Sequence, residues 1–533
     1  MSGHVWWQTG VIYEIYPRSF QDSDGDGVGD LAGVIERLDY LADVLGVEAI
    51  WLAPFYPSPM ADFGYDVADY CDVDPLFGDL ATFDRLLEAA HGRGLRVIVD
   101  WVPNHTSDRH PWFLESRSFR GSAKRHWYVW RDPGPHGPPN NWLSALGGSA
   151  WEWDEATEQY YLHSFLPQQP DLNWRNPEVE EVMLETLRFW LDRGVDGFRV
   201  DVAHFVMKDP ELRDNPPNPQ PSGWMGLHPV REYDRQLHLY DRGHPDVHEV
   251  YRKVRRLLDS YRPDRVGIGE IHLFEWPEWV SYYGINDEFH LPFNFALLAA
   301  PWEAWAVRQV VDSLEAALPE GAWPNYVLGN HDEARLASRL GECQARVAAL
   351  LLLTLRGTPT LYYGDELGMS DLLIPSRLQQ DPFERHEPGR GRDGSRAPMP
   401  WDGERNFGFS SGKPWLPLPD DAAELNVAAQ LVDSRSILSL YRRLLDYRRS
   451  NPALRWGTYR PLEVPASCFA YLRQAEGPTV LVALNFEAGR QHICLPGLGT
   501  GKLVLSSHLD RDGPVDCDDL VLRADEGVVV ELG

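Results

Sequence analysis

One short run of the sequence decides the fold, and it reads Gly197-Phe198-Arg199-Val200-Asp201-Val202. Its apolar residues predict a buried strand, yet the strand carries a guanidinium and a carboxylate. Because side chains alternate across a strand, Arg199 and Asp201 share one face. Charged residues are rare in buried strands. A structural ion pair would explain these two on its own, but other runs of the chain end in the same way.

Two further strand-like runs also end in carboxylates. They are Arg265-Val266-Gly267-Ile268-Gly269-Glu270 and Asn325-Tyr326-Val327-Leu328-Gly329-Asn330-His331-Asp332. Acids at the ends of three separate strands, namely Asp201, Glu270 and Asp332, indicate one shared site. The competing explanation is three unrelated acids on solvated loops.

Helices and strands alternate along most of the chain. Asp30 and Asp79 each precede a helical pattern of apolar residues, and Gly46 and Gly92 end these two patterns. Strands are expected at 47–53, 95–101 and 358–362, and further helices at 179–192, 250–261, 345–355 and 436–449. Repeated helix–strand units predict an α/β fold with a parallel sheet. Eight such strands would close into a (β/α)8 TIM barrel whose active site lies at the carboxyl ends of the strands.

This alternation breaks in three places. Residues 105–170 are rich in Trp, Pro and Gly and predict a lobe inserted after the third strand, and a second irregular insertion covers about 371–420. From about residue 456, short alternating runs predict an antiparallel β domain. The expected organisation is a catalytic barrel of residues 1–104 and 171–455, an inserted domain B of residues 105–170, and a C-terminal β-sandwich domain C of residues 456–533.

Composition excludes several classes of partner. The formal net charge of -30 over 533 residues disfavours nucleic acid and anionic membrane surfaces, which require clustered Lys and Arg. The five cysteines are scattered and form no CxxC pair, which is typical of reduced thiols. Neither a signal peptide nor an apolar run of about 18 residues is present. We therefore expect a cytoplasmic protein; its oligomeric state is not readable from the sequence.

Four blocks of the sequence together resemble the α-amylase family, glycoside hydrolase family thirteen, over about residues 10–401. The blocks are Asp100-Trp101-Val102-Pro103-Asn104-His105, Gly197-Phe198-Arg199-Val200-Asp201, Gly269-Glu270 and Asn330-His331-Asp332. The resemblance implies that Asp201 is a nucleophile, Glu270 the acid/base and Asp332 a stabiliser of the transition state. It also implies that Arg199, His105 and His331 hold the sugar on the non-reducing side of the cleaved bond. Two carboxyls about 5 to 5.5 Å apart can cleave a glycosidic bond with retention.

Two loop blocks resemble those of α-glucosidases. In Phe63-Gly64-Tyr65-Asp66-Val67-Ala68-Asp69-Tyr70, the resemblance implies that Tyr65 stacks on the terminal glucose and that Asp66 binds its far hydroxyls. In Arg392-Asp393-Gly394-Ser395-Arg396-Ala397-Pro398-Met399-Pro400-Trp401, Arg396 would pair with Asp66 and close one end of the site. Gln169-Pro170-Asp171-Leu172-Asn173 further resembles the signature of oligo-1,6-glucosidases. Ordinary turn chemistry is the alternative for all three blocks.

An acidic loop precedes the first long helix, and it reads Asp22-Ser23-Asp24-Gly25-Asp26-Gly27-Val28-Gly29-Asp30. Hard cations take several oxygen ligands, and a Gly-rich loop can wrap around them. The Glu that ends an EF-hand loop is replaced by Gly33. The resemblance to oligo-1,6-glucosidases implies a structural Ca²⁺, or alternatively Mg²⁺, bound by Asp22, Asp24, Asp26, the Val28 carbonyl and Asp30. The alternative is that Asp30 only caps the helix.

The expected enzyme is a retaining exo-acting α-glucosidase that releases glucose from the non-reducing end of short α-glucosides through a covalent glucosyl-enzyme. Its substrate is a small oligosaccharide, and no cofactor beyond the ion is implied. The resemblance implies a preference for α-1,6 linkages, because Val at the position of Val202 tends to accompany it in this family. The Pro-rich segment 214–221 departs from the usual oligo-1,6-glucosidase pattern, so the linkage stays open. One alternative is a transglucosylase, or a trehalose- or isomaltulose-forming isomerase, that uses the same intermediate. Another is a non-catalytic amylase-like scaffold.

Overall fold

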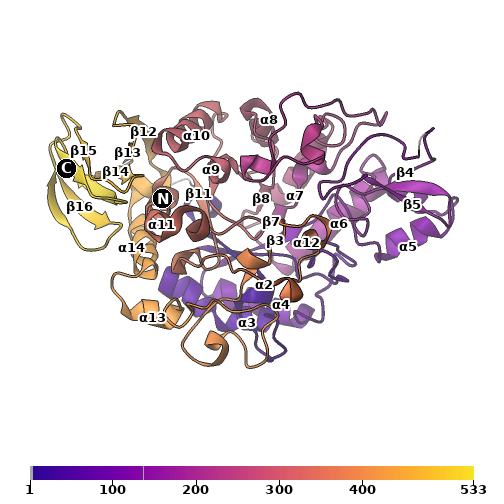
Figure 1. Ribbon diagram of the computed structural model, residues 1–533, viewed down its shortest axis with the longest axis horizontal. Coiled ribbons are helices and arrows are strands. Elements are labelled where there is room, and N and C mark those ends of the chain that lie inside the picture. Colours follow the sequence, from indigo (N-terminus) through magenta and orange to yellow (C-terminus); the bar gives the residue numbers. More distant parts are fainter. Residues whose placement is uncertain (1–3, 136) are drawn as a thin grey trace.

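The computed structural model describes residues 4–135 and 137–533, and its centre is a barrel of parallel strands (Figure 1). The strands pair in the order β10-β11-β1-β2-β3-β7-β8-β9. A parallel bridge between Asn294 and Tyr326 joins the two edges of this sheet. The eight strands are β1 (Ile12–Ile15), β2 (Ala49–Leu52), β3 (Arg96–Trp101), β7 (Gly197–Val200), β8 (Val266–Gly269), β9 (Leu291–Pro292), β10 (Asn325–Val327) and β11 (Thr358–Tyr362). The predicted (β/α)8 fold is confirmed.

Helices surround the barrel, and the long ones lie close to the predicted helices with two exceptions. α11 (Leu336–Thr354) begins at 336 and not at the predicted 345, and α10 (Ala304–Ala317) was not predicted. The side chain of Asp79 accepts a hydrogen bond from the Thr82 amide and caps α4. The long helices are α4 (Leu80–Gly92), α6 (Pro177–Arg193), α7 (Val247–Asp259), α10 (Ala304–Ala317), α11 (Leu336–Thr354) and α14 (Ile437–Ser450). Shorter ones are α1 (Trp6–Thr9), α2 (Pro17–Phe20), α3 (Leu31–Glu36), α5 (Pro111–Ser118), α8 (Trp276–Val280), α9 (Ala296–Ala299), α12 (Pro382–His386), α13 (Val427–Val432) and α15 (Pro452–Trp456).

The first predicted helix is interrupted. Asp30 caps α3 by accepting from the Gly33 amide, as expected, but α3 ends at Glu36. A π-helical turn, η1 (Tyr40–Leu45), then continues to Gly46, whose φ is 79°. A π-turn changes the helical register, and here Tyr40, Leu41 and Leu45 are all buried.

The inserted lobe and the C-terminal domain lie at opposite ends of the molecule (Figure 1). The lobe holds a three-stranded antiparallel sheet in the order β4-β6-β5, formed by β4 (Trp130–Arg131), β5 (Trp151–Asp154) and β6 (Gln159–Leu162). The C-terminal domain has a six-stranded sheet in the order β12-β13-β14-β19-β16-β17 and a two-stranded one of β15 and β18. Its strands are β12 (Thr458–Leu462), β13 (Cys468–Gln474), β14 (Thr479–Asn485), β15 (Gln491–Ile493), β16 (Thr500–Ser506), β17 (Gly513–Asp516), β18 (Leu520–Leu522) and β19 (Gly527–Leu532).

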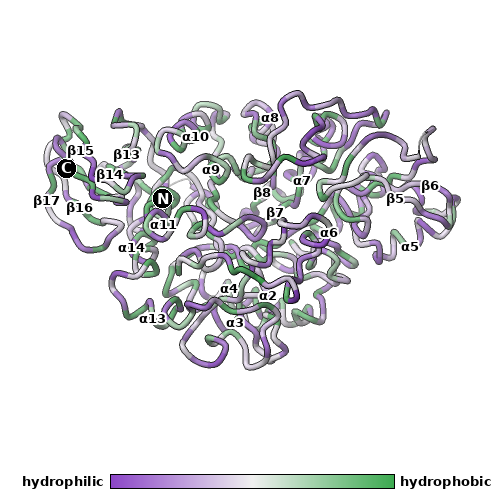
Figure 2. The backbone as a smooth tube through the Cα atoms, in the orientation of Figure 1, coloured by the Kyte–Doolittle hydropathy of each residue, from purple (hydrophilic) through white to green (hydrophobic). Residues whose placement is uncertain are grey.

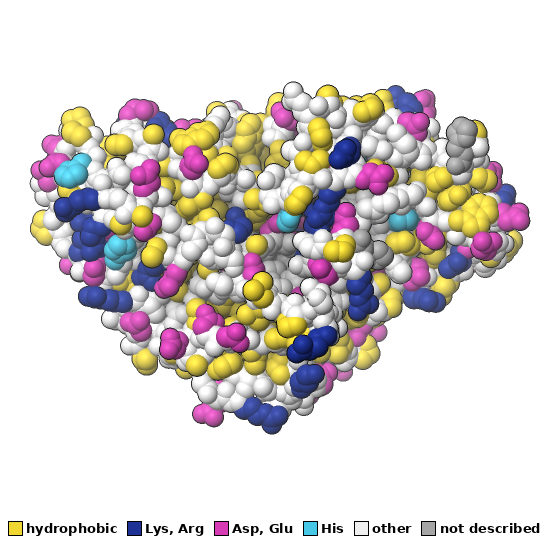
Figure 3. Space-filling view, viewed as in Figure 1, with side chains coloured by type: hydrophobic (Ala, Val, Ile, Leu, Met, Phe, Trp, Pro, Cys, Tyr) yellow, Lys and Arg dark blue, Asp and Glu magenta, His cyan; other side chains and the backbone are white. Residues whose placement is uncertain are grey.

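The surface agrees with the composition. Hydrophobic and hydrophilic stretches alternate along the backbone, as expected where each element buries one face (Figure 2). On the face drawn in Figure 3, acidic and basic side chains of the described residues are interspersed, without a basic patch. None of the described helices combines the length and hydrophobicity that a membrane span requires. All five cysteines are free thiols.

The barrel interior changes from apolar to charged along β3 and at the end of β8. Ile98 and Ile268 belong to one buried apolar cluster inside the barrel. Asp100 lies two residues after Ile98, and Glu270 lies two residues after Ile268; both acids are buried. Because residues two apart face the same side of a strand, the inward positions at the carboxyl ends present acids to one space above the apolar core.

Candidate active site

Three carboxylates from three strand ends line one cavity. Asp201 directly follows β7, Glu270 directly follows β8, and Asp332 lies shortly after β10. All three line a cavity of about 670 Å³ at the carboxyl ends of the barrel strands. Residues far apart in the chain thus share one site, because parallel strands present the same ends to the same side of the barrel.

The guanidinium of Arg199 connects two of these acids. Its Nη1 donates to Asp201 Oδ1 at 2.8 Å and to Asp100 Oδ1 at 2.6 Å. Its Nη2 lies 2.6 Å from Glu270 Oε2. Both acids are therefore held by the two nitrogens of one guanidinium. This favours the short separation of a retaining pair, about 5 to 5.5 Å, over the wider spacing that leaves room for a water between substrate and base.

The pKa values of the two acids shift in opposite directions. Burial raises the pKa of Glu270, but the Arg199 guanidinium and the hydrogen bond with His272 outweigh it and hold this pKa at about 2. Burial raises the pKa of Asp201 well above its usual value against the pull of Arg199, and the carboxylate of Glu270 adds to the rise. The Val202 amide also donates to Glu270 Oε2, at 2.8 Å, and so further stabilises the carboxylate of Glu270.

Asp332 is held by two arginines at the inner end of the cavity. Its Oδ1 accepts from Arg392 Nη1 at 3.0 Å and from Arg396 Nη2 at 2.9 Å. Burial opposes ionisation, but the neighbouring His331, and then these two arginines, hold the pKa of Asp332 well below its usual range. Asp332 is therefore a fixed negative charge, which can stabilise positive charge that develops at an anomeric carbon.

The pair that closes the inner end differs from the predicted one. Arg392 Nη2 donates to Asp62 Oδ1 at 2.7 Å, and the same guanidinium binds Asp381 through Nε and Nη2. Asp62 and Arg392 both line the cavity. Arg396, the predicted partner, instead donates to Asp332 and to the His331 carbonyl.

The prediction that Asp66 binds sugar hydroxyls and pairs with Arg396 is wrong in this structure. The Asp66 carboxylate is buried in its own loop, where it accepts from Ser58 Oγ and from the amides of Ala61 and Asp62. Both predicted regions do reach the site, but the acid–arginine pair is formed by residues four positions earlier than the two chosen, Asp62 and Arg392. Asp62 lies just before the quoted block, and the block alone gave no signal of which carboxylate turns inward.

The remaining predicted side chains surround the same space. Tyr65 and His105 line the cavity. The ring of His331 stacks on Tyr65 at 5.4 Å, and its Nδ1 lies 2.5 Å from Glu14 Oε1, so it stands behind the lining. Burial lowers the pKa of His105 to about 4, which keeps its imidazole neutral at neutral pH. Sequence reasoning missed Asp62, Arg392, Gln169, Asp100, Glu14 and His272 as parts of the site.

Three chain segments meet at the mouth of the cavity. In the segment between β7 and α7, His228 Nε2 lies 2.9 Å from Glu333 Oε2, and both residues line the cavity. From the same segment Arg231 forms an ion pair with Glu387, a residue of the irregular insertion. The Glu387 side chain also abuts Gly147 of the inserted lobe. We call Arg231 and Glu387 the mouth pair.

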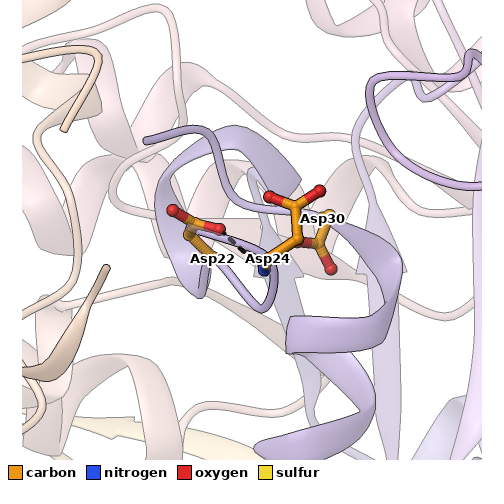
Figure 4. Close-up of side chains that lie close together, drawn as sticks. All are labelled: Asp22, Asp24 and Asp30. Atoms are coloured by element: carbon orange, nitrogen blue, oxygen red, sulfur yellow. Dashed lines mark hydrogen bonds between the residues drawn. The ribbon is translucent and has the colours of Figure 1, made fainter. Parts of the chain in front are cut away.

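The acidic loop brings three carboxylates together (Figure 4). Ligand oxygens of Asp22, Asp24 and Asp30 lie within 4.8 Å of one another. Asp22 also accepts from the amides of Asp24, Gly25 and Gly27. The Asp26 carboxylate accepts from the Val28 amide and is not part of this group of described residues. The three clustered oxygens are the kind that a hard cation takes, and Asp30 caps α3 as well.

Comparison with known proteins gives concordant matches. The family model "Alpha amylase, catalytic domain" matches residues 14–457. A probable α-glucosidase of Rhizobium meliloti is 44% identical, with 90% of this chain and 89% of that protein covered. An oligo-1,6-glucosidase of Parageobacillus thermoglucosidasius is 37% identical over 99% of both chains. The crystal structure of an α-glucosyl transfer enzyme, XgtA, is 43% identical with a TM-score of 0.94 over 99% of both chains.

Proposed function

The chain belongs to the α-amylase family and is a glycoside hydrolase, and on this basis we propose that it is a retaining, exo-acting α-glucosidase. The observation that carries the proposal is the cavity in which Asp201, Glu270 and Asp332 meet while Asp62 and Arg392 close the inner end. A cavity closed at one end admits a chain terminus only, so glucose is the expected product. Three acids in one cavity also argue against a non-catalytic scaffold.

The proposed reaction has two steps. A carboxylate oxygen of Asp201 attacks the anomeric carbon while Glu270 gives a proton to the glycosidic oxygen, whose bond to that carbon breaks. Asp332 stabilises the positive charge that develops on the ring. In the second step Glu270 takes a proton from water, and the water oxygen replaces Asp201 on the anomeric carbon. Two inversions give net retention.

We expect a preference for short substrates because of the contacts at the mouth of the cavity. The mouth pair joins the segment between β7 and α7 to the irregular insertion, and the inserted lobe packs against the same Glu387. Room for sugars beyond the leaving group is therefore limited. Both α-1,4 and α-1,6 disaccharides are candidates for the substrate.

One set of experiments tests the proposal. The wild-type enzyme is assayed on maltose, isomaltose and maltodextrins, and NMR follows the anomer that forms first; α-glucose is expected. Asp201→Asn should lose turnover by a factor of at least about 10⁴ while the melting temperature stays close to wild type. Glu270→Gln with an activated aryl glucoside should accumulate a glucosyl ester, which mass spectrometry should locate on Asp201. Near-normal rates of Asp201→Asn, or β-glucose as the first product, would refute the proposal.

A second candidate is glucosyl transfer to an acceptor other than water, through the same intermediate. Two observations favour it: the likeness to an α-glucosyl transfer enzyme and the apolar mouth of the cavity. Leu372, Leu373 and Ile374 line this mouth, and the Leu373 side chain is 100% exposed. An apolar rim favours an organic acceptor over water. Chromatography of the products at high sugar concentration separates transfer from hydrolysis.

We also propose a structural cation, Ca²⁺ or Mg²⁺, at the acidic loop. The proposal rests on the three clustered carboxylates of Asp22, Asp24 and Asp30. The loop lies outside the cavity of the catalytic acids, so the ion would stabilise the fold around α3 and take no part in the reaction.

A further inference from the structure

The two carboxylate oxygens of Glu270 have different partners. Oε2 forms an ion pair with Arg199 Nη2 at 2.6 Å and accepts a hydrogen bond from the Val202 amide at 2.8 Å. Oε1 lies 2.8 Å from Nε2 of His272. Because a cation and an amide donor already face Oε2, a proton on this carboxyl is placed at Oε1, beside His272.

His272 is built into the site. It lies two residues after Glu270, lines the same cavity and is only 8% exposed. Its ring stacks on Phe295, with centroids 4.3 Å apart and planes at 18°. This packing fixes the imidazole against the carboxyl oxygen that must carry the catalytic proton.

The other charged and titratable groups near Glu270 cannot share this proton, so His272 is the group that can. The charged and titratable groups that face the pair are Arg199, Asp201, His204, Arg242 and Asp332. Burial, and then the Arg242 cation, lower the pKa of His204 well below its usual value, so His204 stays neutral. Arginine side chains such as Arg199 and Arg242 stay protonated in proteins. Asp332 is ionised because its pKa is lowered.

We propose that the catalytic proton is held jointly by Glu270 Oε1 and His272 Nε2, which makes His272 a positioning residue for the acid step. The inference rests on the proposed glucosidase function. The pair shares one proton across the 2.8 Å contact between Glu270 Oε1 and His272 Nε2. Two ionisable groups in such close contact are coupled. The low pKa of Glu270 on its own would leave almost no acid at neutral pH.

The proton balance over the two steps is complete. As the substrate binds, the proton passes from His272 Nε2 to Glu270 Oε1 and then to the glycosidic oxygen. That oxygen keeps the electron pair of its breaking bond to the anomeric carbon, while an Asp201 oxygen forms the new bond. In the second step the Glu270 carboxylate takes a proton from water, the ester bond to Asp201 breaks, and the proton returns to the pair.

The test is His272→Gln, since a glutamine amide can still donate to Glu270 Oε1 but cannot store a proton. General acid catalysis contributes roughly 10²- to 10⁴-fold. We therefore expect kcat/KM for maltose at neutral pH to fall by about 10-fold or more. The loss for p-nitrophenyl α-glucoside, whose leaving group needs little protonation, should be no more than about threefold. The alkaline limb of the maltose pH profile should move to lower pH.

Two controls separate this role from packing. Phe295→Leu loosens the packing of the imidazole but keeps the group that shares the proton, so the alkaline limb should move less than in His272→Gln. Glu270→Gln gives the reference for complete loss of the acid. If His272→Gln folds, by circular dichroism and melting temperature, but lowers both substrates equally or keeps the wild-type limb, the inference is wrong. If the wild-type enzyme hydrolyses neither substrate, the proposed function fails instead.

Discussion

Arg199 shows how one buried side chain organises the site. Its guanidinium contacts Asp100, Asp201 and Glu270, and it is itself 1% exposed. A buried cation among several carboxylates costs less free energy than an isolated one, since each charge replaces lost water with a charge-assisted hydrogen bond. Three acids would repel one another without it. The strand on which the fold prediction was based therefore also holds the proposed catalytic acids in place.

The first prediction concerns the inner end of the cavity. Asp62→Asn should lower kcat/KM for maltose by roughly 10²-fold, because it removes the charge that holds Arg392 and loses acceptors at the closed end. Arg392→Lys should have a similar effect because a lysine cannot reproduce the bonds to Asp62, Asp332 and Asp381. The measurement is steady-state kinetics per folded molecule.

The matched control is Asp66→Asn. Burial raises the pKa of Asp66 to about 6, and its oxygens bind only Ser58 and two amides of its own loop. This variant should lose less than about threefold in kcat/KM, although its melting temperature can fall, because the lost acceptors belong to the fold. A larger kinetic loss for Asp66→Asn than for Asp62→Asn would reverse the assignment.

These two blocks show which single residues of the site could be predicted from the sequence and which could not. Asp201 and Glu270 were located because they end strands, and the period of two fixes which way a strand side chain points. Asp62 and Arg392 lie on loops, where no period predicts orientation. The blocks were identified by resemblance, but the choice of Asp66 and Arg396 within them had no geometric basis. Asp332 also lies on a loop, and its block placed it in the cavity.

Among the elements, regular strands were predictable and short irregular ones were not. β13, β14 and β19 lie where short alternating runs predicted antiparallel strands, and most of their residues are buried because the sheet is covered on both faces. β12 and β17 contain Pro461 and Pro514, which weaken a strand pattern. The break between α3 and η1 was missed because the apolar spacing before and after it still fits one helix.

A second prediction belongs to the acidic loop. Removal of divalent ions with EDTA should lower the melting temperature, since Asp22, Asp24 and Asp30 would then repel one another at the start of α3. Ca²⁺ or Mg²⁺ should restore it. Asp24→Asn should lose most of this response. Asp26→Asn is the matched control because the Asp26 carboxylate is outside the cluster. An identical melt with and without EDTA would rule out the cation.

A third prediction concerns the mouth pair. Arg231→Ala and Glu387→Ala should each raise kcat/KM for maltoheptaose relative to maltose, by about threefold or more, because either change releases the two segments from each other. The double variant should resemble the single ones, since each removes the same contact. Arg235→Ala, an exposed change in the same segment, should keep the wild-type ratio. An unchanged chain-length profile in all variants would show that the pair does not restrict the mouth.

At the scale of the whole molecule, the C-terminal domain shares its core with the barrel. Phe469, Val480 and Val482 of β13 and β14 belong to the same buried cluster as the helix α11. The opposite face of the sheet packs on β15 and β18, with Ile493 and Leu520 in a separate cluster. Arg473 reaches across and donates to the Thr354 carbonyl at the end of α11. A change that destabilises this sheet should therefore also destabilise the barrel and the candidate active site.

The last prediction tests this coupling through Glu526, which is fully buried at the start of β19. Its carboxylate binds Arg511 and Arg523 at 2.7 Å each and accepts from Ser506 Oγ at 2.6 Å. Burial raises its pKa, but these partners outweigh burial and lower the pKa from 4.5 to about 2. A depressed pKa stabilises the folded state above the unfolded pKa, and that stability is lost as pH falls from about 4.5 to 2. The shift corresponds to about 3 kcal/mol.

Glu526→Gln should therefore melt at a lower temperature than wild type at pH 7, and the difference should shrink below pH 4.5. Because β19 continues the sheet that packs on α11, maltase activity should disappear over the same temperature range as the secondary structure. Glu487→Gln, which changes an exposed carboxylate nearby, is the control and should match wild type. If the melting difference stayed constant from pH 7 to pH 3, the stabilising charge would have to lie elsewhere. If activity outlasted the C-terminal sheet, that sheet and the barrel would unfold independently.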